Sequence, residues 1–141
     1  MKPALALLLL VVVAGCGGGS SREDYVEEAT AICVEMTQRI TDLGAPESFT
    51  DTQLYARRAK DAVSDGIGEL RELTPPQEFE AGYERYLGTL ELRLRQLDLL
   101  AAAADENSMN AVQLVGTELS VLSAKGRQDT RAAGIAGCED G

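Results

Sequence analysis

The stretch PQEFEAGYERYLGTLELRLRQLDLLAAAAD, residues 76–105, has the pattern of one long amphipathic helix. Pro76 suits a first helical turn, and about 30 residues at 1.5 Å each would make a helix of about 45 Å. Apolar side chains recur at helical spacing at Phe79, Tyr83, Tyr86, Leu87, Leu90, Leu94, Leu97 and Leu100. This stripe is wider than the two-in-seven seam of a coiled coil. It therefore predicts a helix that packs within one core rather than against a coiled-coil partner.

Three further helices are predicted around this segment. Apolar positions spaced by three and four indicate helices over residues 23–43, 51–73 and 109–133. The links between the helices hold glycine, proline or a run of polar residues, which end helices. These links are residues 44–46, 74–76 and 105–108.

The helix ends and the short links predict the topology. Ser20 or Ser21 can cap the first helix, and the stretch from Thr50 to Gln53 has the pattern of a capping box for the second. Short links between long helices place neighbouring helices antiparallel. We therefore predict an all-α fold, an up-down-up-down four-helix bundle, formed as one domain by residues 22–141.

The N-terminus has the features of an export signal. Lys2 supplies a positive charge, and an unbroken apolar segment follows from Ala4 to Ala14. A membrane-spanning helix needs about 20 apolar residues, and this segment is well short of that. Its length and the small residues at its end are typical of a signal peptide.

Four residues make the export signal more specific. Val13-Ala14-Gly15-Cys16 resembles the lipobox of bacterial lipoproteins, in which an aliphatic residue and two small residues precede a cysteine. The resemblance implies that residues 1–15 are a lipoprotein signal peptide and that a lipid is attached to Cys16. Residues 16–21 would then be the lipidated cysteine and a flexible Gly/Ser tether. The expected location is the cell membrane or cell envelope, lipid-anchored and facing outside the cytoplasm.

Charge and missing residue types exclude several classes of function. The chain has 13 Lys and Arg against 23 Asp and Glu, a net charge of −10, and no histidine. Nucleic-acid binding needs clustered basic residues, so no nucleic-acid partner is expected. Without histidine, His-containing zinc sites, His-ligated haem and the Glu-x-x-His motif of di-iron bundles are excluded. We predict no catalytic residue, no metal site and no cofactor.

The basic side chains are predicted to be surface residues that pair with acids one helical turn away. Two groups stand out, Arg57-Arg58 with Lys60 and Arg93 with Arg95. Asp61 and Glu91 are the kind of partner that we expect for them.

Two cysteines remain after lipidation, Cys33 and Cys138. An exported protein meets an oxidising compartment, where such a pair becomes a disulfide. In an up-down-up-down bundle, the end of the fourth helix returns to the level at which the first helix starts, and residues 134–137 are flexible enough to fold back. We predict a Cys33–Cys138 disulfide, which stabilises the fold by about 4–5 kcal/mol in the chain-entropy model. A redox-active thiol is the alternative, but it needs a basic neighbour or a Cys-x-x-Cys motif.

The whole chain is similar in outline to small helical lipoproteins of high-GC bacteria. The matching features are Cys16, Cys33, the Thr74-Pro75-Pro76 link and Cys138. This resemblance implies a lipid anchor and a helical domain but no activity.

We predict a non-enzymatic interaction or structural module, which uses a helix face or groove to contact another protein of the cell envelope. The alternative is a binding lipoprotein that holds a small molecule or a lipid between its helices. Glycines inside the predicted helices hint at such a cavity, and they are Gly66, Gly68, Gly82, Gly88 and Gly116. An enzyme that uses paired carboxylates is a distant third class.

Overall fold

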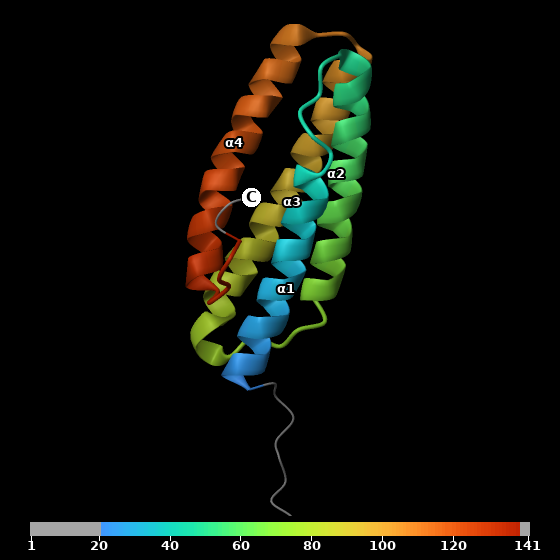
Figure 1. The fold of residues 1–141 in the computed structure, drawn as a ribbon. Coiled ribbons are helices and arrows are strands. Elements are labelled where there is room, and N and C mark those ends of the chain that lie inside the picture. Colours follow the sequence, from blue (N-terminus) through green and yellow to red (C-terminus); the bar gives the residue numbers. More distant parts are fainter. Residues whose placement is uncertain (1–20, 139–141) are drawn as a thin grey trace, which may run out of the picture.

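The fold is all-α, as the sequence predicts. The computed structural model describes residues 21–138, and in that range it contains four helices and no strand. They are α1 (Arg22–Thr41), α2 (Phe49–Leu70), α3 (Gln77–Asp105) and α4 (Met109–Ala132). The helices run alternately up and down the bundle, with the α1–α2 and α3–α4 links at one end and the α2–α3 link at the other (Figure 1).

The helix ends agree with the prediction to within a few residues, but two caps differ. Ser21 caps α1 in a capping box with Asp24. The capping box predicted from Thr50 to Gln53 is wrong, because Ser48 caps α2 and its hydroxyl accepts a hydrogen bond from the Asp51 N–H. The helix therefore starts two residues earlier than predicted. Pro76 is the cap of α3 rather than its first helical residue.

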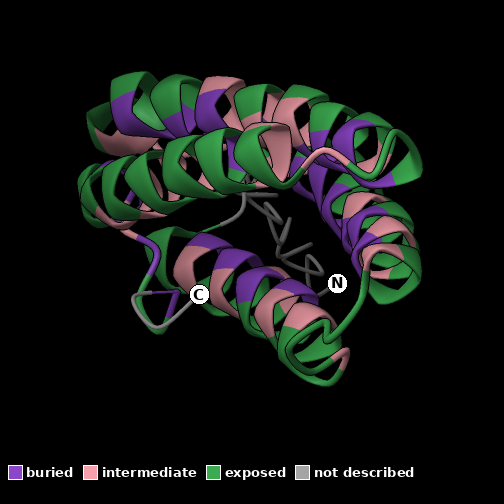
Figure 2. Cartoon of the chain, turned by 90° about the horizontal axis from the view of Figure 1, so that it is seen from above, coloured by how far each residue is buried: buried purple, intermediate pink, exposed green. Residues whose placement is uncertain are grey.

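The third helix is the centre of the packing. It packs against both α2 and α4, whereas α1 packs against α2. The inward face of each helix carries its buried residues (Figure 2). The predicted stripe on α3 is confirmed, since Tyr83, Tyr86, Leu90, Leu97 and Leu100 are buried in the core. The remaining members of the stripe, Phe79, Leu87 and Leu94, are partly buried against it.

The ring of four helices is open between α1 and α4, whose backbones do not approach each other closely. No Cα atom of α1 lies within 8 Å of a Cα atom of α4. Figure 1 shows α4 leaning away from the other helices toward the end that carries the α3–α4 link. We call this end of the bundle the open end.

At the opposite end, the chain after α4 bridges α1 and α4. We call residues 133–138 the C-terminal segment. The Tyr25 hydroxyl of α1 donates a hydrogen bond to the Ala133 carbonyl oxygen, at 2.9 Å. Ala133, Ile135 and Cys138 are all buried. This segment therefore supplies the packing that direct contact between α1 and α4 supplies in a closed bundle.

Of the five helical glycines named from the sequence, two lie in close packing against a neighbouring helix and three have open space beside them. A Cβ atom on Gly82 would lie 2.3 Å from the Ala132 carbonyl group, and one on Gly66 would lie 2.9 Å from the Met36 sulfur. A Cβ atom on Gly68, Gly88 or Gly116 would have no neighbour within 4 Å. Gly82 lets the end of α4 approach the backbone of α3.

Replacing two glycines of α3 with alanine tests this packing. Gly82→Ala forces the end of α4 outward and is expected to lower the free energy of unfolding by about 1–3 kcal/mol. Gly88→Ala has room for its methyl group and removes a flexible residue from a helix, so it is expected to raise that free energy by up to about 1 kcal/mol. Urea unfolding of both variants measures the difference. Equal stability of the two variants would contradict the close approach at Gly82.

Candidate functional site

The predicted cysteine pair lies between α1 and the C-terminal segment. Cys33 and Cys138 are both buried, and the structure pairs them, with Cα atoms 5.7 Å apart. This separation is within the range that a disulfide requires. The Tyr86 hydroxyl of α3 lies 3.1 Å from the Cys33 sulfur. Burial raises the pKa of Tyr86, so this hydroxyl stays protonated beside the sulfurs.

The predicted lipidation site cannot be compared with the structure. Cys16 lies outside the described residues, together with the rest of residues 1–20. Within residues 21–138, no helix combines the length and the apolar character that crossing a membrane requires.

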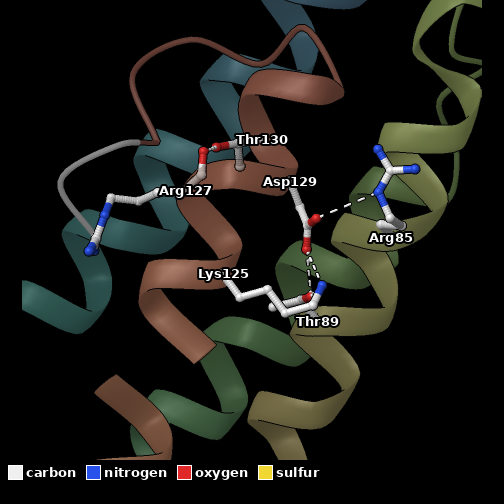
Figure 3. Close-up of polar contacts among 6 residues, drawn as sticks. All are labelled: Arg85, Thr89, Lys125, Arg127, Asp129 and Thr130. Atoms are coloured by element: carbon white, nitrogen blue, oxygen red, sulfur yellow. Dashed lines mark hydrogen bonds and ion pairs between the residues drawn. The ribbon is translucent and has the colours of Figure 1, made fainter. Parts of the chain in front are cut away.

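A buried carboxylate joins α3 and α4. Asp129 accepts hydrogen bonds from Thr89 at 2.8 Å and from Lys125 at 2.5 Å, and Arg85 lies 3.7 Å from its other oxygen (Figure 3). The Asp129 side chain is only 7% exposed. Because polar partners surround it, the carboxylate is satisfied, and we interpret the cluster as a structural contact that fixes the register of the two helices. Arg127 points away from it (Figure 3).

An apolar hollow lies at the open end of the bundle. It has a volume of about 530 Å³ and lies between the start of α2, the end of α3 and the start of α4. We call it the apolar cleft, and Phe49, Tyr55, Leu100, Met109, Val112 and Gly116 line it. Its volume is within the range of about 300–1,000 Å³ that is typical of small-molecule sites.

A second hollow adjoins the apolar cleft. It has a volume of about 330 Å³, and its lining includes Ile40 of α1, Tyr55 of α2 and Arg93 of α3. Tyr55 also lines the apolar cleft, so the two hollows share one wall. Arg93 in turn lines a narrow hollow beside Cys33 and Tyr86. These hollows occupy the space that α1 and α4 leave between them.

The predicted pairing of the basic residues is wrong in its partners. Lys60 pairs with Asp98 of α3 rather than with Asp61, at 2.6 Å. Glu91 pairs with Arg71 of α2, at 2.5 Å, and not with its neighbour Arg93. The acids that face these bases come from the next helix, because antiparallel packing brings whole helix faces together.

Arg93 lies within the buried stripe of α3. Its side chain is half-buried and forms no ion pair or hydrogen bond with any residue in the described range. Burial lowers the pKa of its guanidinium, and the nearby Tyr55 and Tyr86 oppose this shift. Sequence reasoning treated Arg93 as a surface residue. Its burial could have been predicted from the sequence, because Arg93 continues the helical spacing of the buried residues 86, 90, 97 and 100.

Comparisons with family models, with curated proteins and with solved structures find no match for this chain. Among the described residues, no group of three or more His, Cys, Asp or Glu side chains is arranged to hold a metal ion. The function is therefore inferred from the hollows and the side chains that line them.

Thiol counting tests the cysteine pair. We expect no free thiol in the denatured, unreduced Cys16→Ala chain, and a loss of about 4–5 kcal/mol of stability when Cys33 and Cys138 are both replaced by serine, because the closed loop spans most of the domain. Reductant should destabilise the Cys16→Ala chain and leave the serine variant unchanged, as measured by urea unfolding. Two free thiols in the unreduced chain would rule the bond out.

Proposed function

We propose that this chain is a lipid-anchored protein of the cell envelope, attached through Cys16 and exposed outside the cytoplasm. The support is the lipobox at residues 13–16 together with the Gly/Ser tether after it. Six tether residues reach at most about 20 Å, so the start of α1 would lie near the membrane. Since α1 is about 30 Å long, the open end of the bundle would project away from the membrane.

Fractionation tests the anchor. The wild-type protein is expected in the membrane fraction, and Cys16→Ala in the soluble exported fraction or uncleaved, because the proposed attachment is the lipid on Cys16. Cys33→Ser is the matched control, since it also removes one cysteine but leaves the lipobox intact. Retention of Cys16→Ala in the membrane fraction, at the wild-type level and at the processed size, would refute lipid anchoring.

We further propose that the protein is non-enzymatic and binds a small apolar ligand in the apolar cleft. The sequence favoured an interaction module over ligand binding, and the cleft reverses that order. The observation that supports ligand binding is a hollow of about 530 Å³, which lies between three helices and is lined mostly by apolar side chains. A closed four-helix bundle would fill this space with side chains from the facing helix. Here α1 and α4 stay apart, and the space remains available for a ligand.

Filling the cleft tests the binding role. Gly116 lines the cleft, and a Cβ atom added there would meet no atom within 4 Å. Gly116→Trp should therefore fold normally and occupy the ligand volume. We expect the full chain carrying Cys16→Ala to bind the neutral apolar dye Nile red, and Gly116→Trp to weaken this binding by about tenfold, or about 1.4 kcal/mol, in a fluorescence titration.

Gly68→Trp is the matched control. Gly68 also lies in a helix and has equal room, but it is on the exposed face of α2, away from the cleft. This variant should bind Nile red as the parent does. Equal binding by the two tryptophan variants, or no binding by the parent chain, would overturn the binding role.

An interaction with another envelope protein is the second candidate. Five large apolar side chains on α3 and α4 are exposed, at 39–65%, namely Leu92, Leu99, Met109, Leu114 and Val121. The register set by the Asp129 contacts places Leu92 level with Val121, and Leu99 level with Leu114. Such a row is typical of a surface that contacts a partner. Crosslinking in cells from position 114 to one specific envelope protein would favour this function.

A further inference from the structure

Arg93 is a cation without a counter-ion in a highly acidic protein. The chain has 23 acidic residues for 13 basic ones. Arg22, Arg39, Lys60, Arg71, Arg85 and Lys125 all form ion pairs with acids. No carboxylate of the described residues pairs with Arg93, although it lies only two positions from Glu91. The bundle thus leaves this guanidinium available on its inner side.

An unpaired cation in this position is unfavourable for the empty protein. Arg93 is flanked on the same face of α3 by Leu90 and Leu97, and both of these are buried. A charge that is partly removed from water needs a charged or hydrogen-bonding partner to offset the loss of hydration. The phenol groups of Tyr55 and Tyr86 lie near Arg93, but neither is a carboxylate that could form an ion pair with it. An anionic group from outside the protein would supply the missing partner.

The position of Arg93 relative to the apolar cleft indicates the shape of this ligand. Arg93 and Leu100 are two turns apart on one face of α3, a rise of about 10 Å. Tyr55 lines both the hollow that contains Arg93 and the apolar cleft. A ligand with its anionic group at Arg93 would place an apolar chain against Leu100 and Val112 by passing Tyr55, the residue that the two hollows share.

We propose that the cleft binds a single-chain amphipathic anion, a long-chain fatty acid, with its carboxylate on Arg93 and its acyl chain in the apolar cleft. This inference rests on the binding role proposed above and names the class of ligand. A guanidinium offers two parallel N–H donors to a carboxylate. Hollows of about 330 and 530 Å³ suit a ligand of drug-like size, which favours one acyl chain over the two chains of a phospholipid.

A matched pair of ligands tests the proposal without any change to the protein. Palmitate and hexadecanol have the same chain and differ in the charged group. Both are titrated against Nile red bound to the full chain carrying Cys16→Ala. We expect palmitate to displace the dye at a concentration about tenfold lower than hexadecanol does, which is the size of effect that a charge-assisted hydrogen bond produces.

A matched pair of variants then assigns the effect to Arg93. Arg93→Gln should weaken palmitate binding by about tenfold and leave hexadecanol unchanged. Arg95→Gln makes the same change of charge on the exposed side of α3 and should bind palmitate as the parent does. Because it removes an unpaired cation, Arg93→Gln should melt at or above the temperature of the parent, and palmitate should raise the melting temperature of the parent more than that of the variant.

The outcomes separate this inference from the binding role on which it rests. If palmitate and hexadecanol displace the dye equally, or if Arg93→Gln binds palmitate like the parent, the carboxylate assignment is wrong while apolar binding stands. If a two-chain anionic phospholipid in a mixed micelle displaces the dye better than palmitate does, the single-chain assignment is wrong. If neither Nile red nor either ligand binds, the binding role and this inference both fail.

Discussion

The attachment of the C-terminal segment to α1 is the contact that gives this bundle its shape. The Tyr25 hydroxyl holds the Ala133 carbonyl, Ile135 is buried, and Cys138 meets Cys33 in the middle of α1. These residues fill the space between α1 and α4 at one end of the molecule. Because a layer of chain lies between the two helices there, they cannot approach each other. The open end has no such filler, and the apolar cleft lies there.

The third helix makes this open arrangement stable. It packs against both α2 and α4, so α4 is held in place without help from α1. Gly82 brings the end of α4 close to α3, and the Asp129 carboxylate fixes the register between them. A buried carboxylate with three polar partners adds little net stability. It does disfavour any other alignment of α3 and α4, because the carboxylate would then be buried without partners. The α3–α4 pair can therefore form one wall of the cleft, with the start of α2 beside it.

Much of the fold was predictable because it depends on local patterns. The spacing of apolar residues located the four helices, and the even number of cysteines besides Cys16 indicated the pairing of Cys33 with Cys138. The cleft was not predictable, since the same patterns are compatible with a closed bundle, and only the path of residues 133–138 separates α1 from α4. The ion pairs were assigned to the wrong partners because Lys60 and Glu91 meet acids and bases of other helices. The partial burial of Arg93 was not predicted, because charged side chains are expected on the surface, although this position lies within the buried stripe of α3.

These features combine into one physical picture, in which an acidic bundle places a half-buried cation, Arg93, close to an apolar cleft. The most direct measurement is an isotope-filtered NMR experiment on carbon-labelled palmitate bound to the full chain carrying Cys16→Ala. We predict contacts from the acyl chain to the methyl groups of Leu100 and Val112, and a shift of the Arg93 side-chain N–H signal that the alcohol does not produce. Contacts to Val26 and Val34 instead, in the outer groove beside the C-terminal segment, or an unshifted Arg93 signal with palmitate bound, would contradict it.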